Sequence, residues 1–375
     1  MIIKTITCHN VYNYGASLQA YALQNFLEKQ GHQVEIIDYQ PQYLNRTYNF
    51  WYISEKSRFY QITEKNILIH FLYSLCNIPR TYATYGRISP FKKFKNNYLK
   101  CTKKYTTFTE LKNKPPHADI YIAGSDQIWN SILPNGKDPA FFLNFGDKSI
   151  KRISYAASFG ISLIPDNVKD TTKQYLSFLD DISVREITGV KLLSELGYNS
   201  TVVLDPVFLL NTNEWEILAR SIKHVINHKY ILVYDIFQDN NNLISAAQDL
   251  SKKYGLEIVS INDAKKSHYA HHNISNGGPI EFLNLIYNAE FVISCSFHAT
   301  AFALIFHKKF LVFYQKNNIS RMQDLLKSVE LEECLNPKSI DFNKYNWNKI
   351  NDLLNEKISL SKKFILHAIS EKKII

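Results

Sequence analysis

The stretch CHNVYNYGASLQAYALQNFLEKQGHQVEIIDY, residues 8–39, decides the fold because it passes through three kinds of structure. It opens as a polar loop, continues as a helical pattern over 18–30 and ends as an apolar strand over 34–38. Gly31 follows the helical pattern directly and predicts a left-handed cap there. Because residues 2–7 also read as a strand, the segment predicts a strand–helix–strand unit of a parallel sheet.

The same alternation continues along the chain and predicts an α/β fold with largely parallel sheets. In the first half, strands are expected at 120–123, 152–156, 181–184 and 202–204, interrupted by a lysine-rich helical insertion over about 40–114. In the second half, strands are expected at 229–237, 256–261, 290–295 and 309–314, with helices at 241–254, 279–289 and about 346–370. These two runs predict an N-terminal Rossmann-like domain over 1–212, a second one over 213–345 and a C-terminal helix over 346–375.

The composition is that of a soluble globular protein large enough for two domains, since 45% of the 375 residues are hydrophobic and 21% are charged. Five scattered cysteines without a CxxC pair argue against a disulfide framework and against a structural zinc site. Residues 1–7 read as a strand and not as a signal peptide, and the apolar run at 66–78 is too short for a membrane span. We therefore expect a reduced, cytoplasmic setting.

The formal charge of +10 is partly local, because residues 91–114 contain eight lysines and one glutamate. A solvated surface is the simplest interpretation. The functional alternative is attraction to an anionic surface, which can be a membrane, a phosphorylated substrate or a nucleic acid. Since no nucleic-acid-binding motif accompanies the lysines, we expect no nucleic-acid partner.

Polar side chains recur directly after the predicted strands, where ligands bind in an open parallel sheet. For the loops at 9–17 and 124–130 we favour a functional over a structural role. The structural alternatives are that Asn13 caps the next helix, that Gly15 relieves a turn, that Trp129 is core and that Ser125 and Asp126 are turn residues. Asp205, which precedes Pro206, is interpreted as a turn residue. The candidate ligand-contacting residues of these two loops are His9, Asn10, Asn13, Tyr14, Gly15, Ser125, Asp126, Gln127 and Trp129.

Two charged residues after strands point to an anionic ligand. Arg185 needs either a carboxylate partner, such as the adjacent Glu186, or an anion that fits its planar guanidinium. His298 lies in the first turn of an apolar helix, whose N-terminus suits an anion. There it can donate a hydrogen bond or move a proton, and the nearby Ser296 and Thr300 favour this over a buried structural histidine.

The sequence gives little support for a metal site or a nucleotide-binding site. His268, His271 and His272 look like metal ligands, but neighbouring lysines favour a solvated surface. No GxGxxG motif follows the first strand and no P-loop motif occurs, which weakens dinucleotide and P-loop chemistry.

Together these residues resemble the polysaccharide pyruvyl transferase family. The resemblance implies two Rossmann-like domains facing a cleft, as in the glycosyltransferase-B fold. It also implies transfer of a pyruvyl group from phosphoenolpyruvate to two hydroxyls of one sugar, which gives a cyclic ketal and phosphate. The motifs that carry it are residues 8–39, IAGSDQIWN (122–130), ISVREITGVKLLSELG (182–197), VVLDPVFLL (202–210), GGPIEFLNLIYNAEFVISCSFHATAFALIFHKKF (277–310) and SRMQDLLKSV (320–329).

The resemblance also assigns donor-binding residues. Arg185 matches the arginine that grips phosphoenolpyruvate in family members, and His298 matches the histidine of the family's Arg-Leu-His or Ser-Phe-His motif. Ser296 stands where other members have a second arginine, and Arg321 is the candidate substitute. The donor-binding candidates are Arg185, Ser296, Phe297, His298, Thr300 and Arg321.

For the chemistry, we expect His298 to act as the acid or as a phosphate ligand, and Asp126 or the 9–14 loop to take protons from the acceptor hydroxyls. We expect no metal and no cofactor besides phosphoenolpyruvate as co-substrate. Family acceptors are glycans for capsules, exopolysaccharides or cell-wall polymers, some of them lipid-linked, so the lysine run predicts peripheral contact with the inner membrane face. Two alternatives stay open: a nucleotide-sugar-dependent glycosyltransferase of the same architecture, and a non-catalytic glycan-assembly protein.

Overall fold

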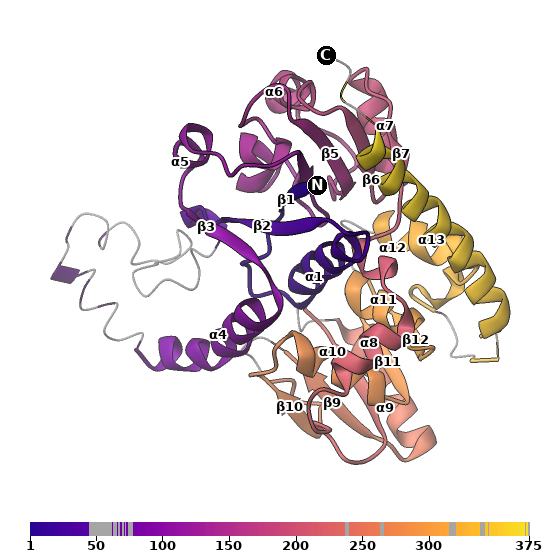
Figure 1. Ribbon diagram of the computed structural model, residues 1–375. Helices are drawn as coiled ribbons and strands as arrows, with labels where there is room; N and C mark the ends of the chain where they lie inside the picture. Colours follow the sequence, from indigo (N-terminus) through magenta and orange to yellow (C-terminus); the bar gives the residue numbers. More distant parts are fainter. Residues whose placement is uncertain are drawn as a thin grey trace.

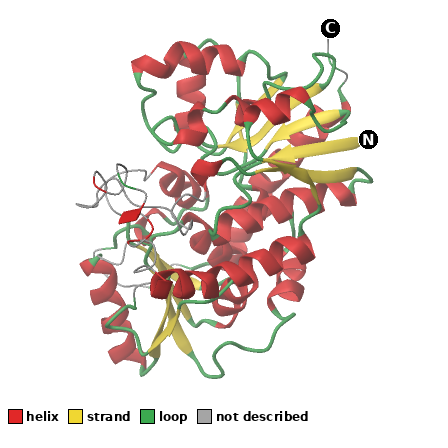
Figure 2. Cartoon of the chain, turned by 90° about the vertical axis from the view of Figure 1, so that its left-hand side faces the viewer, coloured by secondary structure: helices red, strands yellow, loops and turns green. Residues whose placement is uncertain are grey.

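The computed structural model describes residues 1–44, 78–236, 240–262, 266–314, 320–337 and 345–371, with single positions at 62, 66, 68, 69, 71, 73, 342, 343 and 373 and the backbone alone at 78–85. Two α/β units follow each other along the chain, and a long helix runs beside both (Figure 1). The two sheets lie towards opposite ends of the molecule, with helices packed between them (Figure 2).

The first sheet is parallel throughout, and its described strands follow the order β3-β2-β1-β4-β5-β6-β7. Its strands are β1 Ile2–Ile6, β2 Gln33–Tyr39, β3 Cys101–Tyr105, β4 Ile120–Ala123, β5 Lys151–Ala157, β6 Asp181–Val184 and β7 Thr201–Val202. Its α-helices are α1 Tyr14–Lys29, α4 Ile78–Tyr98, α5 Phe108–Asn113, α6 Asp166–Leu176 and α7 Ile187–Glu195. The 3-10 helices are η2 Pro134–Lys137, η3 Pro139–Phe142 and η4 Pro206–Leu209.

The second sheet is also parallel, and its described strands follow the order β10-β9-β8-β11-β12. Its strands are β8 Tyr230–Tyr234, β9 Glu257–Ile261, β10 His272–Ile274, β11 Phe291–Ser294 and β12 Lys309–Val312. The helices are α8 Thr212–Ala219, α9 Asn241–Tyr254, α10 Pro279–Asn288, α11 Phe297–Ile305, α12 Ser320–Ser328, α13 Trp347–Ser370 and the 3-10 helix η5 Glu332–Cys334. Both strand orders contain the reversal typical of Rossmann-like sheets, so the predicted fold class is confirmed.

Helix α1 shows how the opening stretch folds. It begins at Tyr14, earlier than the apolar pattern indicated, because the side chain of Asn13 accepts a hydrogen bond from the backbone N–H of Ala16 at 3.1 Å. It ends as predicted, since Gly31 has a φ of +82° and donates its N–H to the carbonyl of Glu28 at 2.9 Å. Helix α1 thereby starts at the carboxyl end of β1, where its first turn faces the second domain.

Two edge strands differ from the sequence-based expectation. Residues 101–105, predicted within a helical insertion, form β3 and pair with β2. Consecutive exposed lysines, Lys103 and Lys104, hid the strand pattern, and lysine is common on edge strands. Strand β10 is only three residues long and gave no pattern to detect. Elsewhere in the predicted insertion, α4 and α5 are helical as expected, while residues 45–61 and most of 62–77 lie outside the described residues.

The two domains share one hydrophobic core. Tyr14 of α1 stacks on Phe282 of α10 with ring centres 4.6 Å apart, and Tyr21 packs against Trp215. Helix α13 then returns to the first domain, where Ser361 accepts a hydrogen bond from the backbone N–H of Leu204 at 2.8 Å. None of the described helices is long and apolar enough to cross a membrane.

Candidate active site

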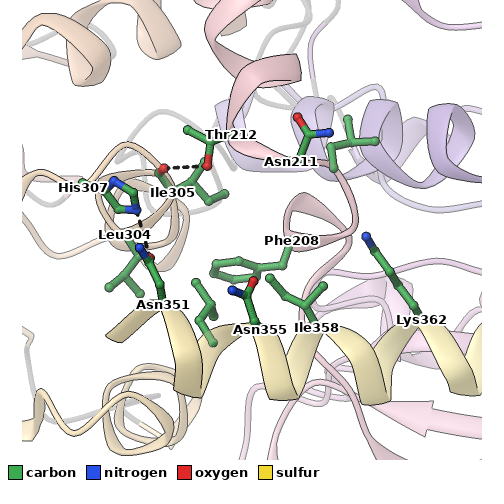
Figure 3. Close-up of a pocket in the computed structure, with 12 residues that line it drawn as sticks. Phe208, Asn211, Thr212, Leu304, Ile305, His307, Asn351, Asn355, Ile358 and Lys362 are labelled. Atoms are coloured by element: carbon green, nitrogen blue, oxygen red, sulfur yellow. Dashed lines mark hydrogen bonds between the residues drawn. The ribbon is translucent and has the colours of Figure 1, made fainter. Parts of the chain in front are cut away.

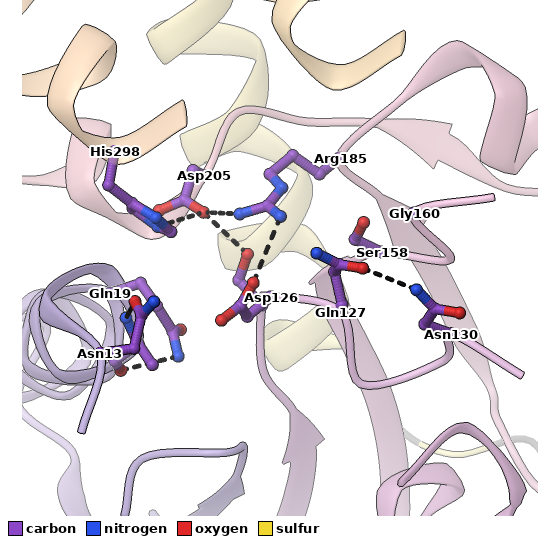
Figure 4. A network of polar contacts seen from close by, with 12 residues as sticks. Asn13, Gln19, Asp126, Gln127, Asn130, Ser158, Gly160, Arg185, Asp205 and His298 are labelled. Carbon is purple, nitrogen blue, oxygen red and sulfur yellow. Dashed lines mark hydrogen bonds and ion pairs between the residues drawn. The ribbon is translucent and has the colours of Figure 1, made fainter. Parts of the chain in front are cut away.

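The segments that follow β4, β6, β7 and β11 converge on one polar network, which the N-terminus of α1 also borders (Figure 4). Asp126, Arg185, Asp205 and His298 point towards one another in it, three of them from the first domain and one from the second. The sequence predicted that Arg185, His298 and Asp126 contribute to one site, and the fold brings them together.

Asp205 lies at the centre of the network. Its Oδ2 accepts hydrogen bonds from Ser125 Oγ at 2.9 Å and from Arg185 Nη1 at 2.5 Å, and His298 Nε2 lies 3.5 Å from the same oxygen. Burial raises the pKa of Asp205, but His298 and Arg185 outweigh it and hold that pKa well below its usual range. Interpreting Asp205 as a turn residue alone is wrong: Oδ1 does cap η4 through the N–H of Val207, but the fully buried carboxylate also joins three loops.

Arg185 is buried and incompletely paired. Its Nη2 is 3.6 Å from Asp126 Oδ1, and its guanidinium carbon is 4.6 Å from the ring centre of Phe297. Burial lowers the pKa of Arg185, but Asp205 and Asp126 raise it more, so the guanidinium stays charged. Within the described part of the chain, its Nε and Nη2 have no hydrogen-bond partner. Such a group needs an acceptor that a ligand can supply.

Glu186, the alternative partner of Arg185, bonds elsewhere. Its Oε1 accepts hydrogen bonds from Ser158 Oγ at 3.0 Å and from the backbone N–H groups of Phe159 at 2.9 Å and Gly160 at 3.1 Å. Gly160 has a φ of +60°, and a Cβ there would lie 2.5 Å from Gln127 Oε1. Glu186 therefore fixes the loop after β5, which in turn packs against the 124–130 loop.

His298 joins the two domains at the N-terminus of α11. Ser296 caps this helix by accepting a hydrogen bond from the N–H of Ala299 at 3.5 Å. The imidazole lies directly against Gly15 of α1, where a Cβ would be 1.9 Å from Nδ1. Gly15 thus allows a close approach between domains instead of relieving a turn. Among the described residues, nothing hydrogen-bonds to His298 Nε2, since the approach to Asp205 is too long and poorly aligned.

Arg321 of α12 adds a second buried guanidinium. Burial and the neighbouring Arg185 lower its pKa, and its Nε has no partner within the described residues. Both arginines line a cavity of about 300 Å³, together with Asp205, Phe297 and Lys357. The cavity therefore combines three cationic side chains with the carboxylates of Asp205 and Asp324 and an aromatic wall.

Other predicted residues lie in the core. Trp129 is fully buried, with Nε1 donating to the carbonyl of Phe141 at 3.0 Å, so it does not line a cleft. His9 is buried as well, with Nε2 3.0 Å from Asp38 Oδ1. Thr300 donates its hydroxyl to the carbonyl one turn earlier in α11. These side chains satisfy their hydrogen bonds internally, which sequence position alone does not reveal.

The remaining loop candidates border the network in different ways. Asn13 is exposed and caps α1, and Asn10 is half-buried. Tyr14 is buried between the domains. Gln127 Oε1 accepts a hydrogen bond from Asn130 Nδ2 at 2.6 Å (Figure 4).

A second cavity, of about 260 Å³, lies between η4, α8, α11 and α13 (Figure 3). Phe208 and Ile358 form part of its apolar wall. His307 and Asn351 also line the cavity and form a hydrogen bond of 2.9 Å with each other. None of the residues predicted for the site lines this cavity. The cavity beside Arg185 is therefore the candidate site.

The lysine run over 91–114 is mostly exposed. Lys95 is the half-buried exception and donates to Asp38 Oδ1 at 2.7 Å, and Lys100 pairs with Glu28 at 2.9 Å. The other lysines of the run are exposed on or beside α4, β3 and α5.

Known structures resemble this chain in fold. The S. aureus MnaA–UDP co-structure has 14% sequence identity and a TM-score of 0.52, covering 99% of this chain and 98% of that chain. A weaker likeness is a Methanocaldococcus jannaschii UDP-GlcNAc 2-epimerase bound to UDP-GlcNAc and UDP, with 13% identity, 96% of this chain and 93% of that chain covered, and a TM-score of 0.49. Another is a Streptomyces glycosyltransferase, with 11% identity, 98% of this chain and 99% of that chain covered, and a TM-score of 0.42. The MnaA likeness, together with the two Rossmann-like strand orders, confirms the predicted glycosyltransferase-B-like fold of two domains.

The sequence comparisons identify the family. The chain matches none of the curated proteins with which it was compared. The family model described as polysaccharide pyruvyl transferase matches residues 13–317, which include Arg185, Asp205 and His298. The chain therefore belongs to the polysaccharide pyruvyl transferase family.

Proposed function

We propose that the protein transfers the pyruvyl group of phosphoenolpyruvate to two hydroxyls of one sugar in a polysaccharide precursor. Both hydroxyl oxygens bond to the central carbon of phosphoenolpyruvate, and its bond to the phosphate oxygen breaks. One hydroxyl proton ends on the methylene carbon, which becomes a methyl group, and the other ends on phosphate. The products are a cyclic ketal and inorganic phosphate.

The observation that carries this proposal is the set of buried, unpaired N–H groups beside Asp205. Among the described residues, Arg185 Nε and Nη2 and Arg321 Nε have no acceptor. Burying cationic groups without full pairing is costly, so the arrangement favours a ligand with several anionic oxygens. Phosphoenolpyruvate has a phosphate and a carboxylate, which two guanidinium groups can bind in a bidentate manner.

His298 is the proposed proton donor to the methylene carbon, or a phosphate ligand. Its ring is held against Gly15, and its Nε2 approaches the same Asp205 oxygen that Arg185 binds. An imidazole placed beside a donor site can pass a proton to it as a general acid or donate a hydrogen bond to a phosphate oxygen. Asp126 is the proposed base for an acceptor hydroxyl, because its side chain is partly exposed beside Arg185.

The acceptor is proposed to be a glycan, and a lipid-linked one would be brought near by the basic surface of 91–114. Exposed lysines attract anionic lipid headgroups at low cost, with about 1 kcal/mol per lysine near the surface. Sedimentation with anionic vesicles, compared with neutral ones, tests this part separately from the reaction.

The test of the donor is a thermal-shift titration with phosphoenolpyruvate, inorganic phosphate and a panel of UDP-sugars. A ligand that binds the native state raises the melting temperature in a saturable way. We expect a shift with phosphoenolpyruvate that Arg185→Ala abolishes. Arg220→Ala is the control, because Arg220 is exposed on the second domain and contacts Glu216 and Tyr287.

The alternatives predict other results. The MnaA likeness is to a co-structure with UDP, so stabilisation by a UDP-sugar alone would favour a glycosyltransferase and reject pyruvyl transfer. A phosphoenolpyruvate shift without phosphate release in the presence of any glycan acceptor would favour a non-catalytic protein. Near-full turnover by His298→Asn would reject the acid role of His298.

A further inference from the structure

Three metal-ligating side chains converge at the end of the second sheet that faces away from the polar network. His228 lies two residues before β8, while Glu257 and His272 open β9 and β10. The Nε2 atoms of both histidines approach the same Glu257 oxygen, at 2.6 Å for His228 and 2.9 Å for His272. All three ligand atoms lie within 4.8 Å of one another.

Strand register explains the convergence. His272 pairs with Val259 of β9, and Val259 is on the same face of that strand as Glu257, two residues earlier. His228 reaches the same point from the segment before β8, the strand on the other side of β9. The three groups therefore belong to three adjacent strands, and no short sequence motif contains them.

We propose that His228, Glu257 and His272 form a binding site for a divalent transition-metal ion, with Zn²⁺ as the best match. Two imidazole nitrogens and one carboxylate oxygen are a ligand set typical of Zn²⁺, with water in the fourth position. Zinc bonds of about 2.0–2.2 Å at tetrahedral angles place ligand atoms roughly 3.3–3.5 Å apart. The carboxylate oxygen therefore needs to move away from each imidazole nitrogen by less than about 1 Å from its present position.

The side chains are free to make that adjustment. Their exposed fractions are 47% for His228, 45% for Glu257 and 42% for His272. Within the described residues, no lysine or arginine pairs with Glu257, and the two imidazoles are the groups that approach its carboxylate. One cation bound between the three side chains would take the place of these two contacts with a single oxygen.

A second cluster of potential ligands shows the contrast. His9, Asp38 and Cys101 also lie within ligand distance of one another. There, however, Lys95 and Gln40 donate hydrogen bonds to Asp38 at 2.7 Å, and burial raises the pKa of the Cys101 thiol to about 12. A lysine already occupies the place of a cation at Asp38, so this cluster is not a metal site.

A metal ion at His228, Glu257 and His272 would connect β8, β9 and the short edge strand β10. Because ligands of an open parallel sheet bind at its carboxyl end, a site at the opposite end serves stability and not pyruvyl transfer. Metal binding to the native state raises its stability by mass action. The proposal is therefore independent of the proposed function.

The test uses the full chain without an affinity tag, first stripped of metal with a chelator. Calorimetric titration with Zn²⁺ and visible absorption with Co²⁺ measure binding and coordination geometry. We expect one ion per chain, a four-coordinate Co²⁺ spectrum and a higher melting temperature with Zn²⁺ but not with Mg²⁺. His228→Ala and His272→Ala should each weaken binding about tenfold or more, the loss expected when a metal-site interaction is removed.

His268→Ala is the matched control, since His268 is an exposed histidine four residues before His272 in the sequence and packs edge-on against Tyr269. It should bind Zn²⁺ as the wild type does. All variants should melt like the wild type when metal-free, because they change only surface side chains. Absence of saturable binding, or unchanged affinity in His228→Ala and His272→Ala, would overturn the proposal. Equal loss in His268→Ala would also overturn it, since it would indicate a different ligand set.

Discussion

Replacing Gly15 by alanine tests how tightly the two domains meet at the site. A Cβ at position 15 would lie 1.9 Å from Nδ1, 2.2 Å from Cγ and 2.4 Å from Cε1 of His298. Since non-bonded heavy atoms need about 3.5 Å, the imidazole would have to retreat by roughly 1.5 Å. The ring is buried and belongs to the first turn of α11, so it cannot swing into solvent.

This displacement gives two magnitudes. Overpacking of a buried contact costs about 1–3 kcal/mol of unfolding free energy. Misplacing a catalytic group by about 1 Å can lower the rate about 100-fold. We therefore expect Gly15→Ala to lower the urea midpoint and to lower kcat for phosphate release far more than it changes the KM for the donor.

The assay compares Gly15→Ala with Gly277→Ala, the same change at a glycine where a Cβ would have no neighbour nearer than 3.3 Å. A double-mutant cycle with His298→Ala isolates the contact, because Gly15→Ala should cost little once the ring is gone. If Gly15→Ala turned over as fast as the wild type, or cost as much stability in the His298→Ala background as alone, this reasoning would be refuted.

Three further variants probe the network and the shared core. Asp205→Asn should lower the unfolding free energy by about 3–5 kcal/mol, because it leaves buried cationic partners uncompensated. The pKa of Asp205 is lower in the folded state, so the stability advantage of the wild type is complete above the unfolded pKa of about 3.9 and is lost as pH falls through the folded pKa. The urea midpoints of the wild type and Asp205→Asn should therefore converge in acid. A gap that stays constant with pH would contradict this. Arg321→Met should melt at or above the wild-type temperature without ligand, since it removes a buried charge next to Arg185, yet raise the donor KM about tenfold or more; a less stable variant with an unchanged KM would reject the donor role. Tyr14→Ala should cost about 3 kcal/mol or more in urea unfolding because it removes the ring stacked on Phe282, and a wild-type midpoint would show that the domains do not depend on this contact.

Much of this architecture could be predicted from the sequence because strands of parallel sheets are short apolar runs between helices. Strands 120–123 and 181–184 and helix 241–254 have the predicted bounds. Edge strands were the exception, since β3 is lysine-rich and β10 is short. An edge strand is paired on one side only and need not follow the buried pattern.

Within the site, position after a strand was enough to predict where Arg185, Asp126 and His298 lie. It was not enough for Asp205, because an aspartate before proline is also typical of a turn, and this residue fulfils both roles. A charged residue between the apolar runs of VVLDPVFLL was the available signal. For the other candidates, the direction of the side chain decided whether they reach the site. His9 and Trp129 also follow strands, but their side chains turn into the core.

Helix α13 has a consequence for the order in which the molecule assembles. Beyond the Ser361 contact with Leu204, the chain end continues along the first sheet, where Lys151 donates to the carbonyl of Glu371 at 3.0 Å and Lys373 pairs with Asp180 at 3.3 Å. The first domain therefore lacks part of its covering until residues 347–373 have left the ribosome, long after its own strands. During synthesis the second domain can therefore complete its sheet before α13 covers the first, so the first domain is expected to close last.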